Sequence, residues 1–332
     1  MFYIFIQQST EHLMWTLLHT KVHKTLQNNL ILPPRKRILV AVSGGQDSLC
    51  LLKIIMDLRL KWDWEIAIAH CDHGWPSDIG ISDHVKRISK DWNIDFYLKQ
   101  TRILKITESV AREWRYKALL EIAKENNFSE IVTGHTSSDL AETVIYNLIR
   151  GAGSHGLSVL TWTRTLVDSI NLVRPLLNIS RAETLFFCKQ FNLPVWEDEV
   201  NTNFNYVRNR IRKQLVPYLK LNFNPQVEKT LYQTAKVLKA ESDYLEKEAQ
   251  KILKLVTNKE KTQLKKKLLK RIPLALQRRV IRMFLQYNNL RAPNFEQIEE
   301  GIKLINSPHG SQTSSFSIKF VLEVHGDYII KK

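Results

Sequence analysis

The sequence predicts an α/β fold: a doubly wound, mostly parallel sheet, followed by a smaller, mainly helical and basic C-terminal domain. Short aliphatic runs recur in the first 133 residues, and such runs are typical of strands buried on both faces of a parallel sheet. Segments with helical spacing of apolar residues separate these runs, as doubly wound folds require. Beyond residue 217 the periodicity is almost entirely helical and the composition is basic.

The chain begins with a predicted helical extension, residues 1–35. Apolar residues at helical spacing in 11–30 predict one amphipathic helix that ends before Pro33. His12, His19 and His23 lie on it without an accompanying cysteine or carboxylate, so we expect surface histidines and not a metal pair. The apolar run at 1–6 is too short for the core of a signal peptide.

The remaining elements follow in order. We expect strands at 38–42, 65–70, 95–98 and 130–133, with helices at 49–58, 82–92, 107–126 and 139–150. Ser180 and Glu183 form a capping box that begins a helix reaching Gln190. A long helix from Asn224 to about Val256, helical periodicity in 261–287 and a hairpin of 316–320 with 328–330 complete the chain. A linker near 215–225 divides it into domains of 36–217 and 218–332.

The charge lies almost entirely in the second domain. The chain carries a net charge of +16, of which residues 1–200 hold +1 and residues 201–332 hold +15. A solvated lysine-rich surface would spread the excess evenly, so this division indicates a polyanion bound mainly by the C-terminal half.

The three cysteines, Cys50, Cys71 and Cys188, form no CxxC pair. Their spacing argues against a disulfide framework, a zinc ribbon or a dithiol redox centre, and indicates a reducing compartment. No apolar run approaches the roughly 18 residues that a membrane span needs. We therefore expect an intracellular protein without a membrane partner.

The loop after the first strand, Ser43-Gly-Gly-Gln-Asp-Ser48, has the chemistry of a phosphate site. Glycines at 44 and 45 let backbone N–H groups approach an anion at the start of a helix, whose dipole favours negative charge. Ser43 and Ser48 add hydroxyl donors. Asp47 repels phosphate, so it is expected to act through a divalent metal or a hydrogen bond to the nucleotide. The loop lacks the lysine of GxxxxGK[ST] loops.

Two further blocks leave alternatives open. His70-Cys-Asp-His73 ends the second strand, where nucleotide contact or loop packing is favoured over metal binding because neighbouring strand residues face opposite ways. Arg112 and Arg115 share one helix face, which suits a phosphate or carboxylate, but surface salt bridges to Glu108 or Glu113 explain them equally well.

His135, Asp139 and Glu142 form the next block. His135 ends the fourth strand, and the two carboxylates are three residues apart on the first turn of the following helix. Acids at this position also serve as plain caps and dipole complements. Together with the loop at 43–48, the block favours a binding site.

Several motifs together resemble the tRNA(Ile)-lysidine synthetases of the PP-loop ATP pyrophosphatase superfamily. The resemblance is dense from about 36 to 217 and thin afterwards. It rests on SGGQDS, AHCDHG, AREWRY, GHTSSDLAET, RPLL at 174–177, WEDEVNTNFNYVRNRIR at 196–212, and IPLALQRRVIRMFL at 272–285. Members often carry GHHxDD in the third block, where this chain has Thr136 and Ser138.

The resemblance implies a two-step ligation. The wobble cytidine of an isoleucine tRNA with a CAU anticodon attacks the α-phosphate of ATP, pyrophosphate leaves, and the ε-amine of free L-lysine then attacks C2 of the adenylated cytidine to release AMP. Mg²⁺ is the implied metal. A tRNA thiolase, a small-molecule amide synthetase and a non-catalytic RNA-binding protein are the alternatives. The sequence does not indicate an oligomeric state. Its bias to Lys, Ile and Asn is typical of an AT-rich genome such as that of an organelle, so plastid stroma and bacterial cytosol both stay candidate locations.

The residue roles are likewise implied. ATP would be bound by Ser43, Gly44, Gly45, Gln46, Asp47 and Ser48, with Asp47 acting through magnesium. Asp139 and Glu142 would hold lysine, while His135 and Arg115 would stabilise the adenylated intermediate. The tRNA would contact the catalytic domain's end and the smaller domain through Arg208, Arg210, Arg212, Arg278, Arg279 and Arg282.

Overall fold

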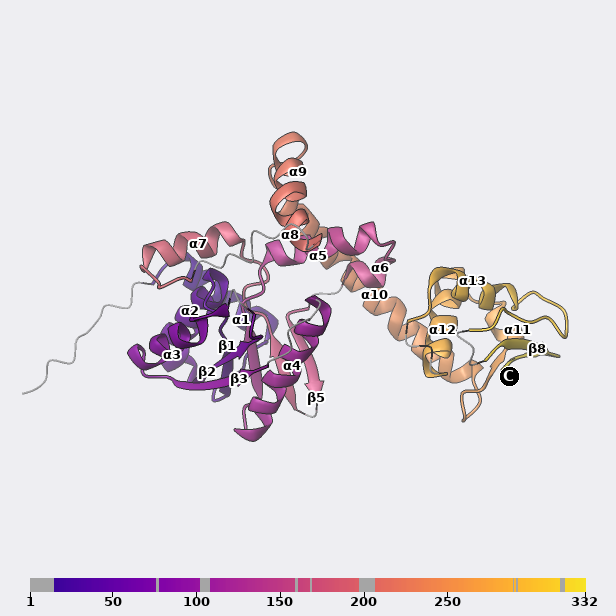
Figure 1. Ribbon diagram of the computed structural model, residues 1–332. Helices are drawn as coiled ribbons and strands as arrows, with labels where there is room; N and C mark the ends of the chain where they lie inside the picture. The colour runs from indigo at the N-terminus through magenta and orange to yellow at the C-terminus, as the bar shows by residue number, and fades with distance from the viewer. Residues whose placement is uncertain are drawn as a thin grey trace, which may run out of the picture. The chain divides into compact units, whose positions relative to one another are not determined.

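The computed structural model (Figure 1) describes residues 15–75, 78–101, 108–158, 161–167, 169–196, 207–288, 290, 292–316 and 320–332. The chain divides into two compact units, Met1–Ala235 and Lys236–Lys332. A single helix, α10 (Val227–Val256), runs through the point of division. The domain boundaries at 35 and 217 stay predictions.

The first unit is built on a six-stranded sheet with the order β3-β2-β1-β4-β6-β5. The strands are β1 (Arg37–Ala41), β2 (Glu65–Asp72), β3 (Asp95–Gln100), β4 (Glu130–Thr133), β5 (Thr163–Val167) and β6 (Ile170–Val173). All neighbours pair in parallel except β5 and β6. The doubly wound, mostly parallel sheet is therefore confirmed, and the antiparallel edge hairpin is an addition that the sequence did not predict.

Helices cover both faces of this sheet. The helices α1 (Leu17–Asn29), α2 (Gln46–Trp62), α3 (Ile81–Asp91) and α7 (Arg181–Gln190) share one hydrophobic core, and α4 (Glu108–Glu125) contributes to a second. Ile38 and Val40 belong to the first core, whereas Leu39 belongs to the second. This alternation follows from strand geometry, which points successive side chains to opposite faces.

The chain order reverses between β1 and β4, which lie side by side in register. Crossovers from β1 lead towards β2 and β3, while β4 continues towards β6. In open α/β sheets, ligands bind at the carboxyl ends of the strands at such a reversal. The loop at 43–48 follows β1 and His135 follows β4, so the two predicted site segments meet there.

Further helices complete the first unit. They are α5 (Ser137–Ile149), α6 (Ser154–Leu157), α8 (Val207–Arg210), a π-helical turn η3 (Ile211–Leu215) and α9 (Val216–Asn222). Ile145 of α5 packs with Ile211 and Val216. Val144 of α5 packs with Ala235 of α10.

The second unit combines helices with a small antiparallel sheet of order β7-β9-β8. Its elements after α10 are β7 (Gln263–Lys265), α11 (Lys266–Leu269), α12 (Leu274–Tyr287), α13 (Phe295–Lys303), β8 (Leu322–His325) and β9 (Tyr328–Lys331). The predicted hairpin exists, but its first strand is β8 and not 316–320, where Phe316 and Phe320 form only an isolated bridge. The helical periodicity of 261–287 is interrupted by β7, which pairs with β9.

One prediction about α1 is wrong. His19 is fully buried, and its ring nitrogens bond to Asp57 Oδ2 at 3.0 Å and to Thr16 Oγ1 at 2.9 Å. His23 accepts a hydrogen bond from the indole of Trp62 at 3.2 Å, and His12 lies outside the described residues. His19 and His23 therefore help to attach α1 to α2. Within the described ranges, no helix is long and apolar enough to cross a bilayer.

Candidate active site

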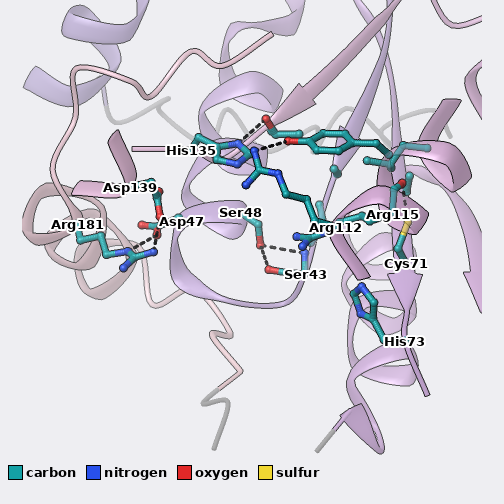
Figure 2. A pocket seen from close by; sticks show the side chains of 17 residues that line it. Ser43, Asp47, Ser48, Cys71, His73, Arg112, Arg115, His135, Asp139 and Arg181 are labelled. Atoms are coloured by element: carbon teal, nitrogen blue, oxygen red, sulfur yellow. Dashed lines mark hydrogen bonds and ion pairs between the residues drawn. The ribbon is translucent and has the colours of Figure 1, made fainter. Parts of the chain in front are cut away.

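A cavity of about 250 Å³ lies at the carboxyl ends of β1, β2 and β4 (Figure 2). Its lining comes from the loop after β1, the end of β2, one face of α4, the turn after β4 and the start of α7. The lining residues include Ser43, Asp47, Ser48, Cys71, His73, Arg112, Arg115, Tyr116, His135, Asp139 and Arg181. Six of the ten residues predicted for catalysis or ATP binding therefore share one cavity: Ser43, Asp47, Ser48, Arg115, His135 and Asp139.

The loop at 43–48 has the geometry of an anion cradle. Gly44 has φ +86°, a conformation that favours glycine, and Gly45 is the N-cap of α2 without a side-chain cap. The Ser48 hydroxyl donates to the Gly45 carbonyl at 2.9 Å and accepts from the Ser43 N–H at 3.2 Å. The first N–H groups of α2 therefore have no side-chain cap, as phosphate binding at the start of a helix requires.

Gln46 does not share in this cradle. Its amide donates to the Arg181 carbonyl at 3.0 Å and to Thr184 Oγ1 at 2.9 Å, both on α7. This side chain therefore joins α2 to α7, and its contact with a nucleotide stays a prediction.

A cationic wall lies opposite the loop. Arg112 and Arg115 of α4 both line the cavity, which favours the anion-binding interpretation over surface salt bridges. The Arg112 guanidinium donates to the Tyr116 hydroxyl at 3.4 Å. Burial would raise the pKa of Tyr116, but Arg112 and Arg174 lower it. Arg174, from the RPLL segment, is only 3% exposed.

His135 stands against this wall, and its Nδ1 lies 2.9 Å from Thr133 Oγ1. Burial lowers the pKa of His135 to about 3, assisted by Arg174, Arg112 and Arg115 and opposed by Asp139. The imidazole is therefore neutral near pH 7, so it can donate or accept one hydrogen bond without adding to the positive charge.

The acidic side of the site is organised by Arg181, the first residue of α7 (Figure 2). Its guanidinium binds Asp47 Oδ2 at 2.9 Å, Asp139 Oδ1 at 2.8 Å and Glu142 Oε1 at 3.0 Å. Burial would lower the pKa of Arg181, but Asp139, Glu142 and Asp47 raise it. Sequence reasoning missed this residue. The available signal was a cation at the first position of a predicted helix, where the helix dipole disfavours positive charge.

Asp139 has two functions in the structure. Its Oδ2 accepts from the backbone N–H and the hydroxyl of Thr136 at 2.8 Å each, which closes a capping box at the start of α5. Burial would raise its pKa, but Arg181, His135 and the Thr136 N–H lower it. Ser138 accepts a hydrogen bond from the Arg181 N–H at 3.3 Å. The two departures from the GHHxDD pattern thus support the local structure around Asp139.

Glu142 and Arg212 form a pair that the sequence did not predict. Glu142 is 4% exposed, and Arg212 binds it through Nε at 2.7 Å and Nη2 at 2.9 Å. Arg212 was expected to contact tRNA, but here its guanidinium neutralises a buried carboxylate. Of its predicted neighbours, Arg208 lies over the ring of Tyr146 at 5.8 Å and Arg210 is exposed.

The predicted arginines of the second unit are also engaged within the protein. Arg279 is 8% exposed and donates to Glu246 at 3.1 Å, so it presents almost no surface to a phosphate. Arg282 binds the same carboxylate at 2.7 Å, and Arg278 binds Glu299 at 2.7 Å. All three arginines stay predictions for tRNA binding, and Arg279 is the most deeply buried of them.

The block at the end of β2 divides its residues between packing and the cavity. His70 is 4% exposed, with Nδ1 2.7 Å from the Val42 carbonyl, and burial lowers its pKa. Cys71 and His73 line the cavity at the end away from Arg181 (Figure 2). Burial raises the pKa of the Cys71 thiol to about 12. Over the described residues, no group of three or more His, Cys, Asp or Glu side chains is placed to hold a metal ion.

The fold and the site together define a class of protein. A parallel sheet with a lysine-free phosphate loop after β1, facing arginines across a cavity at the chain reversal, is the arrangement of a PP-loop nucleotide-binding enzyme. Residues 15–219 match the PP-loop domain family, and residues 264–314 match the TilS substrate binding domain. Among solved structures, the U34-tRNA thiolase NcsA from Methanococcus maripaludis matches with a TM-score of 0.57 at 18% identity, over 67% of this chain and 77% of that one.

Curated relatives specify the family. A tRNA(Ile)-lysidine synthase from Synechocystis sp. is 50% identical over 95% of this chain and 97% of its own length. One from Nostoc sp. is 47% identical over 96% and 97%, and the chloroplastic one from Pyropia yezoensis is 39% identical over 88% and 89%. The chain belongs to the tRNA(Ile)-lysidine synthase family of tRNA-modifying ligases.

Proposed function

We propose that this protein ligates free L-lysine to C2 of the wobble cytidine in isoleucine tRNA with a CAU anticodon, converting ATP to AMP and pyrophosphate. The observation that carries the proposal is the cavity itself. It joins an uncapped phosphate loop, a cationic wall and a carboxylate cluster in one space, within a chain half identical to a lysidine synthase. These are the binding groups that an adenylation followed by attack of an amine needs.

The first step uses the loop and the wall. The N–H groups at the start of α2 and the hydroxyls of Ser43 and Ser48 would hold the pyrophosphate of ATP. Arg112 and Arg115 across the cavity would bind the α-phosphate, where negative charge is shared between attacking and leaving oxygens. Neutral His135 would donate a hydrogen bond to the adenylated cytidine.

Asp47 fits magnesium by its chemistry, because carboxylate oxygens are the ligands that this ion takes in nucleotide sites. Bound there, the ion would neutralise charge on the pyrophosphate. Both oxygens of Asp47 already accept hydrogen bonds, Oδ1 from Thr184 at 2.5 Å and Oδ2 from Arg181 at 2.9 Å. Metal binding at Asp47 therefore requires that these partners give way.

The second step uses the acidic side. Asp139 faces the cavity, and we propose that it binds the ε-ammonium of lysine and takes part in its deprotonation, with Glu142 behind it. The reference pKa of a lysine side chain is about 10.4, so a neighbouring base is required before attack. Because both carboxylates are bound by Arg181, lysine must compete with that residue.

The tRNA would be bound largely by exposed cations of the C-terminal half. In this half, Lys265, Lys267 and Lys270 are exposed on and beside β7 and α11, and Lys267 also pairs with Asp327 at 2.7 Å. Lys266 is not a candidate, since it is 9% exposed and donates to the Ser307 carbonyl. The proposed location is the cytoplasm, or the plastid stroma if the chain is organelle-encoded, and relatives from Synechocystis sp. and from a chloroplast support these two locations.

A tRNA thiolase is the second candidate, favoured only by the shared fold of the thiolase NcsA, which carries a [4Fe-4S] cluster. The cysteines argue against it. Cys50 and Cys188 are 0% and 3% exposed in the core, while Cys71 lines the cavity. The three thiols therefore do not converge on one exposed position where a cluster or sulfur donor could be held.

A lysine-incorporation assay tests the proposal. The protein is incubated with ATP, radiolabelled lysine and two isoleucine tRNA transcripts that differ only by C or U at the wobble position. We expect label in the C transcript alone, with one AMP released per lysine. Label in neither transcript, or label that does not require ATP, contradicts the proposed function; sulfur incorporation instead would support the thiolase.

A further inference from the structure

Arg181 is the one guanidinium among the described residues that contacts Asp47, Asp139 and Glu142 together. The three carboxylates come from two helices, α2 and α5, and Arg181 comes from a third, α7. Its five donors in a rigid fork allow this shared binding, which an ammonium could not reproduce.

Every oxygen of the three carboxylates already accepts a hydrogen bond within the protein. Asp139 Oδ1 accepts from Arg181 and its Oδ2 from Thr136. Both oxygens of Glu142 accept from Arg212, and Oε1 also accepts from Arg181. An incoming cation therefore finds the carboxylates occupied, although Arg181 and Arg212 neutralise only two of three charges.

A small second cavity lies on the other side of Arg181. It has a volume of about 80 Å³, and its lining includes Glu142, Arg212, Lys220 and Glu228. Arg181 lines both this cavity and the larger one, whereas Asp47 and Asp139 line only the larger. Arg181 thus lies between the nucleotide cavity and a space that is bordered by Glu142 and one further carboxylate, Glu228, and into which its side chain can move.

We infer that Arg181 is a positioning residue that serves as a resident counter-ion for Asp47 and Asp139, and that it moves towards Glu142 when cationic ligands bind. This inference rests on the proposed function, which supplies magnesium and the lysine ammonium as those ligands. It explains why three acids are kept together beside a phosphate loop: Arg181 neutralises them until the ligands replace it. Its displacement also links the metal at Asp47 to lysine at Asp139.

The charge balance of the cluster predicts that loss of the Arg181 charge strengthens lysine binding. Without the Arg181 charge, the cluster changes from a net −1 to a net −2, and its carboxylates are released for an ammonium ion. Coulomb attraction over a few ångströms in a partly buried site is large enough to strengthen lysine binding. If Arg181 only supported the carboxylates structurally, its loss would disorder them and weaken lysine binding.

Titration of L-lysine into the full-length protein, without ATP or tRNA, distinguishes these two roles. We expect Arg181→Met to lower the Kd for lysine at least about tenfold, equivalent to about 1.4 kcal/mol. Lys21→Met is the matched control, because Lys21 pairs with Glu183 on the same helix as Arg181 at 2.8 Å but lines neither cavity. Its Kd should equal that of the wild type. An unchanged or higher Kd in Arg181→Met overturns the inference.

A second variant covers the case in which Arg181→Met does not fold. Arg181→Ala is prepared with methylguanidinium chloride, which can refill the space of the lost side chain. We expect methylguanidinium to compete with lysine in this variant and to leave the wild type unaffected. Lysine binding that is insensitive to methylguanidinium in Arg181→Ala overturns the inference by a separate route.

The wild-type incorporation assay separates this inference from the proposed function. If the wild type attaches lysine to the C transcript while Arg181→Met binds lysine no more tightly, only the role of Arg181 is wrong. If the wild type attaches no lysine, the proposed function is wrong whatever the binding data show.

Discussion

At the residue scale, the site depends on groups whose charge is set by burial. His135 and His73 both line the cavity, and burial lowers their pKa values to about 3 and about 4. Arg112 and Arg115 stand beside them, so protonated imidazoles would add repulsion to the cationic wall. Neutral histidines add no positive charge to the wall and still offer directional hydrogen bonds. The sequence alone did not reveal this, because neither burial nor neighbouring charge is visible in it.

This arrangement predicts a pH dependence of stability. The folded pKa of His135 is about 3 against 6.5 for the free group, so between these values the unfolded chain binds more protons. The free energy of unfolding therefore rises with pH between these two values, and above pH 6.5 His135 no longer makes it depend on pH. His135→Asn should flatten the acid limb between pH 6.5 and 4, by up to about 1.4 kcal/mol per pH unit.

Urea unfolding followed by tryptophan fluorescence measures this change. All eight tryptophans of the chain lie between Trp15 and Trp196, so the signal reports only the first unit. In the His135→Asn variant, part of the pH dependence of stability remains, because burial also lowers the pKa of His73 to about 4. His84→Asn, which loses a contact to the Pro194 carbonyl outside the cavity, is the control. Equal slopes for wild type and His135→Asn would contradict the assignment of a neutral, buried imidazole.

At the element scale, the regular pattern was predictable and the irregular part was not. The strands at 38–42, 65–70, 95–98 and 130–133 were each found within two residues at either end. Buried parallel strands leave apolar runs, which explains all of them except the edge strand at 95–98, which is not buried. The β5–β6 hairpin was missed, since β6 has only four residues and β5 is partly exposed. Arg181 was missed for a different reason: its partners come from α2 and α5, and only the tertiary fold brings them together.

A close approach between two elements gives the second prediction. A Cβ added at Gly134, in the turn from β4 to α5, would lie 2.8 Å from the Asp47 carbonyl oxygen and 3.1 Å from the Ser48 nitrogen. These are backbone atoms in the first turn of α2, so they cannot move without distorting the phosphate loop. Gly134→Ala should destabilise the first unit by about 1–3 kcal/mol and weaken ATP binding at least tenfold.

Gly153→Ala is the matched control, because a Cβ there meets nothing within 4 Å. Gly153 is the N-cap of the short helix α6, where Ala is less favourable than Gly, so the change should cost no more than about 1 kcal/mol and leave ATP binding unaltered. Equilibrium binding of a fluorescent ATP analogue, together with urea unfolding, measures both effects. Normal ATP affinity in Gly134→Ala would show that the turn after β4 does not hold the phosphate loop in place.

At the scale of the whole molecule, the cavity is lined by residues 41–181, whereas most of the net charge lies in residues 201–332. Residues 1–200 carry a net charge of +1, and residues 201–332 carry +15. The first unit uses its arginines locally, in the cavity wall and the carboxylate cluster. In the second unit, Arg278, Arg279 and Arg282 are paired with glutamates, so the charge available for a polyanion lies mainly on lysines. Counting charges in the sequence identified the basic half, but it could not show which of the cations pair with carboxylates in the folded protein.

Salt dependence of tRNA binding follows from this division. Phosphate contacts release counter-ions, so log Kd for tRNA should rise steeply with log salt concentration, with a slope of about 0.7–0.9 per contact. Replacing Lys265, Lys267 and Lys270 with Gln should weaken binding and lower the slope by about 2, since three exposed cations are removed, of which Lys267 pairs with Asp327 at 2.7 Å. The matched control replaces Lys86, Arg87 and Lys90, which are exposed on α3 of the first unit, with Gln. Filter binding from 50 to 200 mM KCl gives both slopes. If the α3 variant loses as much slope as the C-terminal variant, only net charge matters, and the second unit is not the main surface for tRNA.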